Sequence, residues 1–176
     1  MRSLFYIKKH FLYFRHARKG KYAHSPFVYQ LSMAVFEKKS PLSTAKHPIL
    51  LNSPLSEGLE EVFNGKYGLL TAKIAAYFNV KTVVSFPSDP IQPADMTLIN
   101  IATQPQVAYD YFEETVKYSD NDSVIIIKEL YHSPASALVW GKIKSHPKTT
   151  VTLDLFHIGI VFFRRESSKE NFIVKY

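Results

Sequence analysis

The chain has 176 residues, which suits one domain with a small appendage, and its 46% hydrophobic content is too high for intrinsic disorder. It has no cysteine, which excludes disulfides, thiolate metal sites and cysteine nucleophiles, and no apolar run reaches the roughly 18 residues of a membrane span. The formal charge of +7 lies entirely ahead of Glu37, the first acid. A cysteine-free chain whose N-terminus does not resemble a signal peptide predicts a cytoplasmic protein.

Residues 1–22 form a basic arm with the periodicity of a helix. Its apolar residues recur at helical spacing on one narrow stripe: Leu4, Ile7, Phe11 and Phe14. The cations that could contact a polyanion are Lys8, Lys9, Arg15, Arg18, Lys19 and Lys21. Three interpretations stay open: the stripe packs on the domain while the charges are solvated, the arm binds RNA through phosphates and stacking, or it lies on an anionic membrane surface.

The segment after the arm is expected to be helical, with a linker inside it. Ser25-Pro26 is typical of a helix start, and residues 40–56 form a polar, proline-punctuated linker. Ser53-Pro54 predicts a short helix that Gly65 and Gly68 interrupt, after which apolar residues resume a helical spacing as far as Phe78.

Three strands and two helices are predicted next along the chain. The strands are KTVVSF (81–86), DMTLINI (95–101) and SVIIIKEL (123–130), the last with four β-branched apolar residues in a row. One helix, within residues 106–118, carries Ala108, Phe112 and Val116 on one face. The other begins at Ser133-Pro134 and carries Ala135, Val139, Trp140 and Ile143.

The end of the chain has the pattern of a β-hairpin. Two alternating runs, TTVTLDLF (149–156) and IVFFRR (160–165), are joined by a few residues that include Gly159. Trp140, Phe162 and Phe163 are expected in the core. Alternating strands and helices that end in a hairpin predict an α/β fold of about five mostly parallel strands, with one strand reversed. The expected domains are the arm with its linker at 1–50 and the α/β domain at 51–176.

The connection between the first two strands is unusually short. Residues 87–95 read PSDPIQPAD, whereas a parallel crossover normally takes a dozen residues or more and a helix. Nine extended residues can nevertheless return along a five-residue strand of about 17 Å, and three prolines suit an extended path. We therefore expect a helix-free crossover.

The C-terminal residues WGKIKSHPKTTVTLDLFHIGIVFFRRE, within a match from Tyr109 to Tyr176, resemble a bacterial family of class I S-adenosylmethionine-dependent methyltransferases. HSPFVY near the N-terminus and KYGLLTAKIAAYF before the first strand are similar to the same family. The resemblance implies a reduced Rossmann-like methyltransferase fold. It also implies that the crossover at 87–95 replaces strands and helices that the family has between its first and fourth strands.

The family's cofactor motifs are degenerate in this chain. The acidic position that ends the first strand is Ser85, and the two glycine positions of the cofactor loop are Pro87 and Ile91. The functional Asp of the family's fourth strand falls on Asn100. The family's acidic pair after its fifth strand falls on Lys128 and Glu129, which replaces one carboxylate with a cation.

These substitutions predict a methyltransferase-like protein that has lost cofactor binding and catalysis and acts as a binding or assembly module, a pseudoenzyme with no cofactor. One alternative is an active S-adenosylmethionine-dependent methyltransferase with an atypical cofactor site. Another is an RNA-associated accessory protein that uses its basic arm. No substrate is identified. Because the family's second strand is missing, the first strand is expected to be a sheet edge, and a homodimer through this edge is a possible assembly.

Two further groups of residues are candidates for chemical sites. Glu129, His132, Asp154 and His157 are compatible with metal binding, but we expect them to be exposed turn and strand-end residues. Ser133 beside His132 suggests a nucleophile, yet Ser-Pro after a strand is better explained as a helix cap.

Overall fold

The computed structural model describes residues 4–20, 23–37 and 65–176, and the chain divides into two compact units. One unit combines residues 1–19 with 82–176, and the other comprises residues 20–81. The boundary that was expected between residues 50 and 51 lies outside the described residues, as do the linker at 40–56 and the helix expected at Ser53-Pro54.

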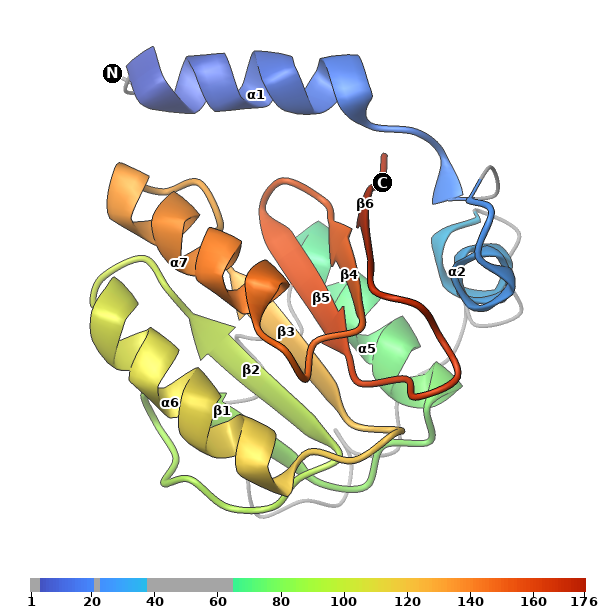
Figure 1. Ribbon diagram of the computed structural model, residues 1–176, viewed down its shortest axis with the longest axis vertical. Coiled ribbons are helices and arrows are strands. Elements are labelled where there is room, and N and C mark those ends of the chain that lie inside the picture. Colours follow the sequence, from blue (N-terminus) through green and yellow to red (C-terminus); the bar gives the residue numbers. More distant parts are fainter. Residues whose placement is uncertain (1–3, 21–22, 38–64) are drawn as a thin grey trace. The chain divides into compact units, whose positions relative to one another are not determined.

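A six-stranded mixed sheet forms the centre of the first unit (Figure 1). Its strands lie in the order β1-β2-β3-β5-β4-β6, and β5 is the one strand that runs antiparallel to its neighbours. Their bounds are β1 Val83–Phe86, β2 Met96–Asn100, β3 Val124–Lys128, β4 Val151–Asp154, β5 Ile158–Phe162 and β6 Glu170–Ile173. The predicted α/β class, the mostly parallel sheet and its one reversed strand are confirmed, and β6 was not predicted.

The predicted hairpin is formed by β4 and β5, with Leu153 opposite Ile160. Its second strand, β5, inserts between β4 and β3, so that the hairpin extends the parallel part of the sheet at β3. The chain then turns back, and β6 pairs parallel with β4 at the far edge.

Helices α6 (Pro105–Tyr118) and α7 (Pro134–Ser145) cover one face of this sheet. The predicted faces are confirmed for Ala108, Phe112 and Val116 and for Val139, Trp140 and Ile143, all of which are buried against the sheet. Phe162 and Phe163 are also buried, as expected.

Ala135, which was named with Val139, Trp140 and Ile143, does not share their burial. It is exposed, whereas the neighbouring Ser136 is fully buried and its hydroxyl donates a 2.9 Å hydrogen bond to the carbonyl of Ile101. A polar side chain can be buried here because it finds an acceptor on the backbone after β2.

The crossover from β1 to β2 contains no helix, as predicted, and the two strands are parallel. Among the described strands β1 pairs only with β2, so the predicted edge position is confirmed. The edge is partly occupied by its own chain, because Asp89 bonds both backbone groups of Ser85. Ser85 donates its N–H to the Asp89 carboxylate at 2.7 Å, and its carbonyl accepts from the Asp89 N–H at 2.7 Å.

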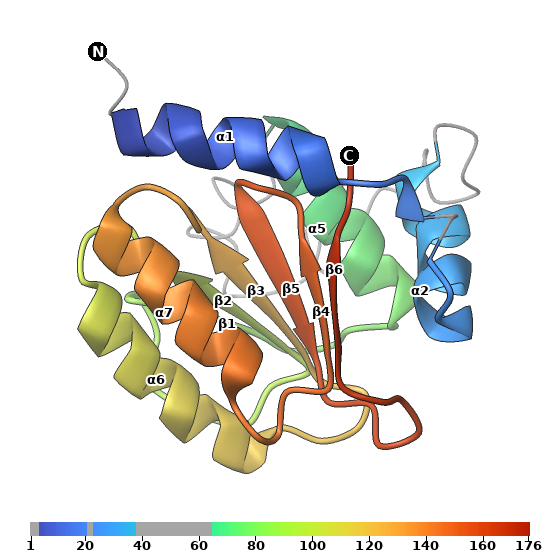
Figure 2. The same cartoon turned by 45° about the horizontal axis from the view of Figure 1, so that its top comes forward.

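The predicted helix of the arm is α1 (Leu4–His16), which runs across one end of the sheet in both ribbon views (Figures 1 and 2). It contacts the segments that follow β3, β4 and β6, at Tyr131, Phe156 and Val174 respectively. After α1, Arg18 forms an isolated parallel bridge with Val174. The arm therefore lies at the carboxyl ends of these three parallel strands.

The second unit contains α2 (Pro26–Leu31), a π-helical turn η2 (Ser32–Phe36) and α5 (Gly65–Tyr77). Ser25 caps α2 as predicted, since its hydroxyl accepts from the N–H of Val28 at 3.4 Å. The expectation that Gly68 interrupts a helix was wrong, because it lies within α5, which buries Leu70 and Ile74. Gly65 begins α5, and the helix that it was expected to interrupt lies outside the described residues. Burial of that apolar side offsets the low helix propensity of glycine.

Candidate functional site

The turn after β1, where the resemblance implies a cofactor loop, is held by contacts within the chain. Besides the Ser85–Asp89 pair, the hydroxyl of Tyr111 on α6 donates to the carbonyls of Asp89 and Pro90, at 3.4 and 3.5 Å. Pro87 has no N–H, and Ile91 is exposed. The turn therefore offers few free backbone donors to a ligand.

The next two motif positions lie side by side, because Asn100 and Lys128 are register partners at the ends of β2 and β3. The side-chain oxygen of Asn100 accepts a 2.9 Å hydrogen bond from the N–H of Ala102, a local turn that orders the strand end. Glu129 follows with a φ of 65°, and its N–H donates to the carbonyl of His157 at 2.7 Å. Asn100 and Glu129 therefore help to shape the loops that follow β2 and β3.

A buried carboxylate is the main polar feature of this end of the sheet. Asp154, at the end of β4, is 3% exposed. Its Oδ2 accepts hydrogen bonds from the Tyr131 hydroxyl and from Trp140 Nε1, the latter at 2.9 Å, and its Oδ1 accepts from the N–H of Phe156 at 2.9 Å. Burial raises the pKa of the Tyr131 phenol, and the negative charge of Asp154 raises it further.

The expectation that Asp154 is an exposed strand-end residue was wrong. An acid among alternating apolar residues of a strand is a signal of a buried polar network, and Trp140 and Tyr131 were the available donors. These partners come from α7 and from the loop after β3, so spacing along the chain could not pair them with Asp154.

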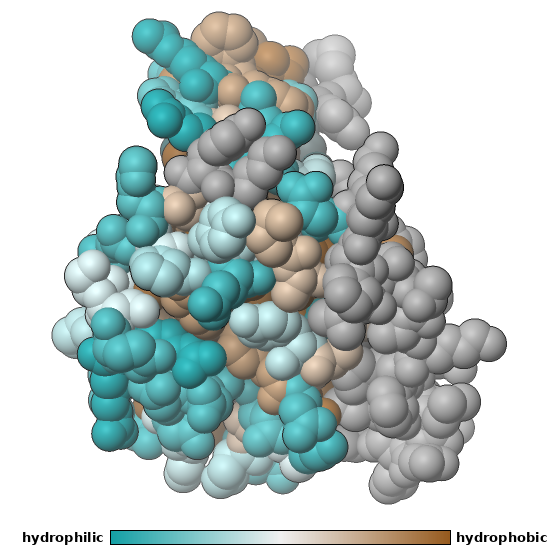
Figure 3. Space-filling model, turned by 90° about the vertical axis from the view of Figure 1, so that its right-hand side faces the viewer, coloured by the Kyte–Doolittle hydropathy of each residue, from teal (hydrophilic) through white to brown (hydrophobic). Residues whose placement is uncertain are grey.

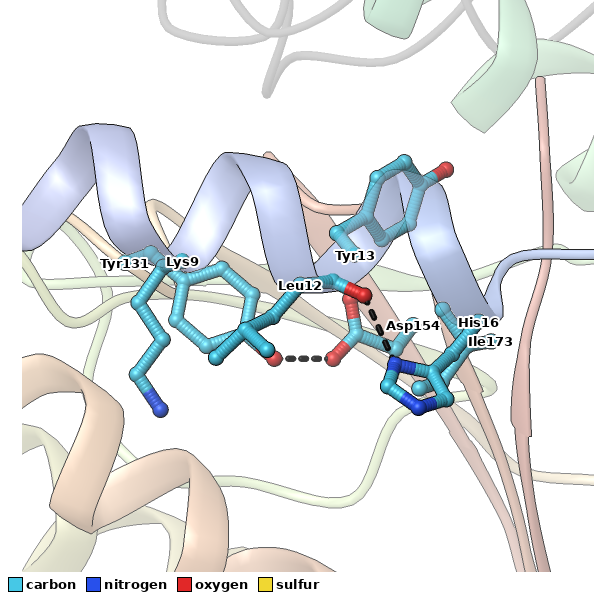
Figure 4. Close-up of a pocket in the computed structure, with 7 residues that line it drawn as sticks. All are labelled: Lys9, Leu12, Tyr13, His16, Tyr131, Asp154 and Ile173. Atoms are coloured by element: carbon cyan, nitrogen blue, oxygen red, sulfur yellow. Dashed lines mark hydrogen bonds between the residues drawn. The ribbon is translucent and has the colours of Figure 1, made fainter.

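A small pocket of about 170 Å³ lies between α1 and Asp154 (Figure 4). Lys9 lines one side and His16 the other, and the ring of Tyr131 lies between Lys9 and the carboxylate. The full lining is Lys9, Leu12, Tyr13, His16, Tyr131, Asp154 and Ile173. Its volume is below the roughly 300–1,000 Å³ of pockets that hold drug-sized ligands and cofactors.

The residues weighed as metal ligands are not gathered into one centre. Asp154 is occupied by its three donors, the carbonyl of Glu129 accepts the N–H of His132 at 3.2 Å, and His157 lies 3.4 Å from the Tyr6 hydroxyl. Within the described ranges, no three His, Asp or Glu side chains are grouped so that they could hold a metal ion. Ser133 caps α7 as predicted: its hydroxyl accepts from the N–H of Ser136 at 3.0 Å.

The arm packs on the domain through a different face from the one its hydrophobicity suggests. Tyr6, His10, Tyr13 and Ala17 face the domain, and Phe156 contacts the rings of Tyr6, His10 and Tyr13. Tyr13 is buried and donates a 2.5 Å hydrogen bond to the carbonyl of Val174. Residues with polar tips fit a sheet end that presents carbonyl groups, because aliphatic side chains there would leave those groups unpaired.

The apolar stripe of α1 is consequently exposed, which contradicts the interpretation that it packs on the domain. Leu4, Ile7, Phe11 and Phe14 are 84%, 55%, 68% and 52% exposed. Brown and teal side chains gather beside each other where α1 lies, at the top of the space-filling view (Figure 3). Of the cations that could contact a polyanion, Lys8, Arg15, Arg18 and Lys19 are exposed, Lys9 is half-buried and Lys21 lies outside the described residues.

No helix in the described part of the chain is both long enough and apolar enough to cross a bilayer. Comparisons with protein-family models, with curated proteins and with solved structures found no match to this chain.

Proposed function

We propose that this chain is a methyltransferase-like protein that has lost S-adenosylmethionine binding and acts as a binding module. The fold-level support is the arrangement of strands. In the family the first strand lies beside the fourth, and here β1 lies beside β2, whose sequence resembles that fourth strand. An antiparallel hairpin completes the sheet beside β3. Because fold does not dictate function, the proposal depends on the site.

The observation that carries the proposal is the pair of hydrogen bonds between Ser85 and Asp89. A nucleotide-type cofactor needs a loop whose backbone N–H groups point at it and whose glycines allow close approach. Here the N–H at the end of β1 is taken by a carboxylate of the same chain, and proline replaces the first glycine.

The neighbouring strand ends support the same conclusion. The oxygen of Asn100 is committed to the N–H of Ala102, and an amide in place of a carboxylate is a weaker acceptor for cofactor hydroxyls. In α/β sheets ligands bind outside the carboxyl ends of the strands, and α1 covers those ends at β3, β4 and β6 through its contacts with Tyr131, Phe156 and Val174.

Calorimetric titration of the full chain with S-adenosylmethionine and with S-adenosylhomocysteine tests the proposal. We expect no saturable heat at millimolar ligand. Thermal denaturation provides a second readout, since a ligand at 100 times its dissociation constant adds about 2.7 kcal/mol of stability. A micromolar dissociation constant by either method would overturn the proposal and favour the alternative, an active methyltransferase with an atypical site.

A further inference from the structure

The solvent-facing side of α1 is a candidate binding surface. Its stripe of Leu4, Ile7, Phe11 and Phe14 spans the helix, while Tyr6 and Tyr13 hold another face of the same helix on the domain. We infer that this stripe, with its flanking cations, binds the surface of an anionic membrane. The inference does not rest on the loss of cofactor binding.

Helix α1 is held on the domain by backbone and side-chain hydrogen bonds. Besides the Tyr13 hydroxyl bond to Val174, Arg18 just beyond the helix donates its N–H to the carbonyl of Ile173 at 3.0 Å. The carbonyl of Arg18 accepts from the N–H of Lys175 at 2.9 Å. The helix is thus fixed at both its packed face and its C-terminal end, so its stripe stays exposed without an opening step.

The exposed side of α1 combines the apolar stripe with neighbouring cations. Lys8 and Arg15 lie four residues after Leu4 and Phe11, which makes them neighbours of the stripe on the helix surface. No acid precedes Glu37, so the helix presents cations without competing carboxylates of its own. An apolar row flanked by lysine and arginine is the pattern of a helix that lies in the interface of a bilayer, attracted by anionic headgroups.

The composition of the stripe distinguishes a membrane from a nucleic acid as its partner. Single-stranded RNA is bound by aromatic rings that stack on bases and by cations on phosphates. Two members of the stripe, Leu4 and Ile7, are aliphatic and cannot stack, and Leu4 is the most exposed member. Acyl chains accept aliphatic and aromatic side chains alike, so the composition of the stripe favours lipid.

Co-sedimentation of the full chain with vesicles tests the inference. We expect binding to vesicles of phosphatidylglycerol mixed with phosphatidylcholine, a steep loss with added salt, and no binding to phosphatidylcholine alone. Ile7→Ser combined with Phe11→Ser should weaken binding by about tenfold or more. Leu138→Ser is the matched control, because Leu138 is an equally exposed aliphatic residue, on α7, and it should leave binding unchanged.

The charges are tested separately. Lys8→Ala combined with Arg15→Ala should weaken binding by about 25-fold, since each cation near an anionic surface contributes about a factor of five. Lys117→Ala combined with Lys142→Ala removes the same charge from exposed positions on α6 and α7 and should have little effect. Circular dichroism of each variant checks that the fold is kept.

Because the chain has no cysteine, a single labelling site can report insertion directly. Phe11→Cys carrying an environment-sensitive fluorophore should shift to the blue on phosphatidylglycerol vesicles, and a label at Leu138→Cys should not. Absence of vesicle binding at low salt overturns the inference. So does vesicle binding that survives the Ile7 and Phe11 substitutions, or binding of single-stranded RNA in place of vesicles.

Discussion

The indole Nε1 of Trp140 donates a 2.9 Å hydrogen bond to Oδ2 of Asp154 in the interior of the protein. The hydroxyl of Tyr131 and the N–H of Phe156 also donate to this buried carboxylate, so that all three of its donors are neutral groups. The network joins α7, the loop after β3 and the end of β4, so it positions the whole end of the sheet on which α1 rests.

Removing this carboxylate should be costly. Asp154→Ala leaves two buried donors, on Trp140 and Phe156, and the half-buried Tyr131 hydroxyl without this acceptor. Each buried unsatisfied group costs about 1–3 kcal/mol. We expect a loss of at least about 3 kcal/mol in the free energy of unfolding, measured by urea denaturation. Trp140→Phe keeps most of the ring volume and removes one donor, so its cost should be smaller. A loss below about 1 kcal/mol for Asp154→Ala would show that the network contributes little.

Two glycines provide a matched pair of substitutions to alanine. A Cβ at Gly159 on β5 would lie 2.5–2.8 Å from three ring atoms of Trp140, whereas one at Gly141 in α7 would meet nothing within 4 Å. Gly159→Ala should therefore destabilise the protein by about 1–3 kcal/mol through overpacking. Gly141→Ala should stabilise it by about 0.5–1 kcal/mol because alanine is the better helix former. Thermal denaturation of both variants measures the contrast, and equal effects would contradict it.

The stability of the fold should fall in alkali through Tyr131. Burial, and then the charge of Asp154, raise the pKa of this phenol above its ordinary value of 10.0. The folded protein therefore keeps the proton above about pH 10, where the unfolded chain releases it, so the free energy of unfolding decreases as the pH rises. Burial and Glu113 also raise the pKa of Tyr109, to about 12.

Urea denaturation at several pH values from about 8 to 11 measures this slope. Tyr131→Phe removes the titrating group and should flatten the decline, although it also lowers stability at neutral pH by removing the hydrogen bond to Asp154. Tyr109→Phe is the comparison for a tyrosine outside the Asp154 network. An unchanged slope in Tyr131→Phe would contradict the assignment.

The homodimer through β1 remains a prediction, and Asp89 makes it testable. The carboxylate of Asp89 occupies the N–H of Ser85 on the edge strand, so it competes with any second copy that would pair there. If copies associate through this edge, Asp89→Ala should strengthen association in light scattering. Val83→Pro, which removes a backbone donor from β1, should weaken it. If both the unmodified protein and the Asp89→Ala variant stay monomeric at high micromolar concentration, the homodimer prediction is wrong.

The sequence could predict the elements whose signals are local. Helices α6 and α7 follow from apolar spacing, and α7 also from its Ser133 cap. Strands β1 to β3 follow from apolar runs, and the hairpin from alternation around Gly159. The helix-free crossover followed from chain length alone. Strand β6 was missed because its residues, ENFI, carry no apolar run, and it pairs with β4 through contacts that begin 19 residues apart, at Val151 and Glu170.

The candidate site was less predictable because it depends on contacts between distant segments. Hydrophobicity alone selects the stripe of α1 at Leu4 and Phe11 as its buried face. The packed face is instead decided by the acceptor that Val174 presents to Tyr13, which no local pattern reveals. The burial of Asp154 likewise depends on hydrogen-bond donors that lie on other elements. The sequence draws attention to this acidic residue but does not predict that its side chain is buried.

The contact between Tyr13 and Val174 joins residues 161 positions apart, and this separation sets an order of assembly. Among the described helices α1 is synthesised before the others, yet the carbonyls that receive Tyr13 and Arg18 are made only with the end of β6 and Val174. The docking of α1 is therefore completed after the six strands have been synthesised. A chain that stopped before residue 173 would keep the ring contacts of Phe156 with α1 but would lose the hydrogen bonds that Tyr13 and Arg18 make with residues 173–175.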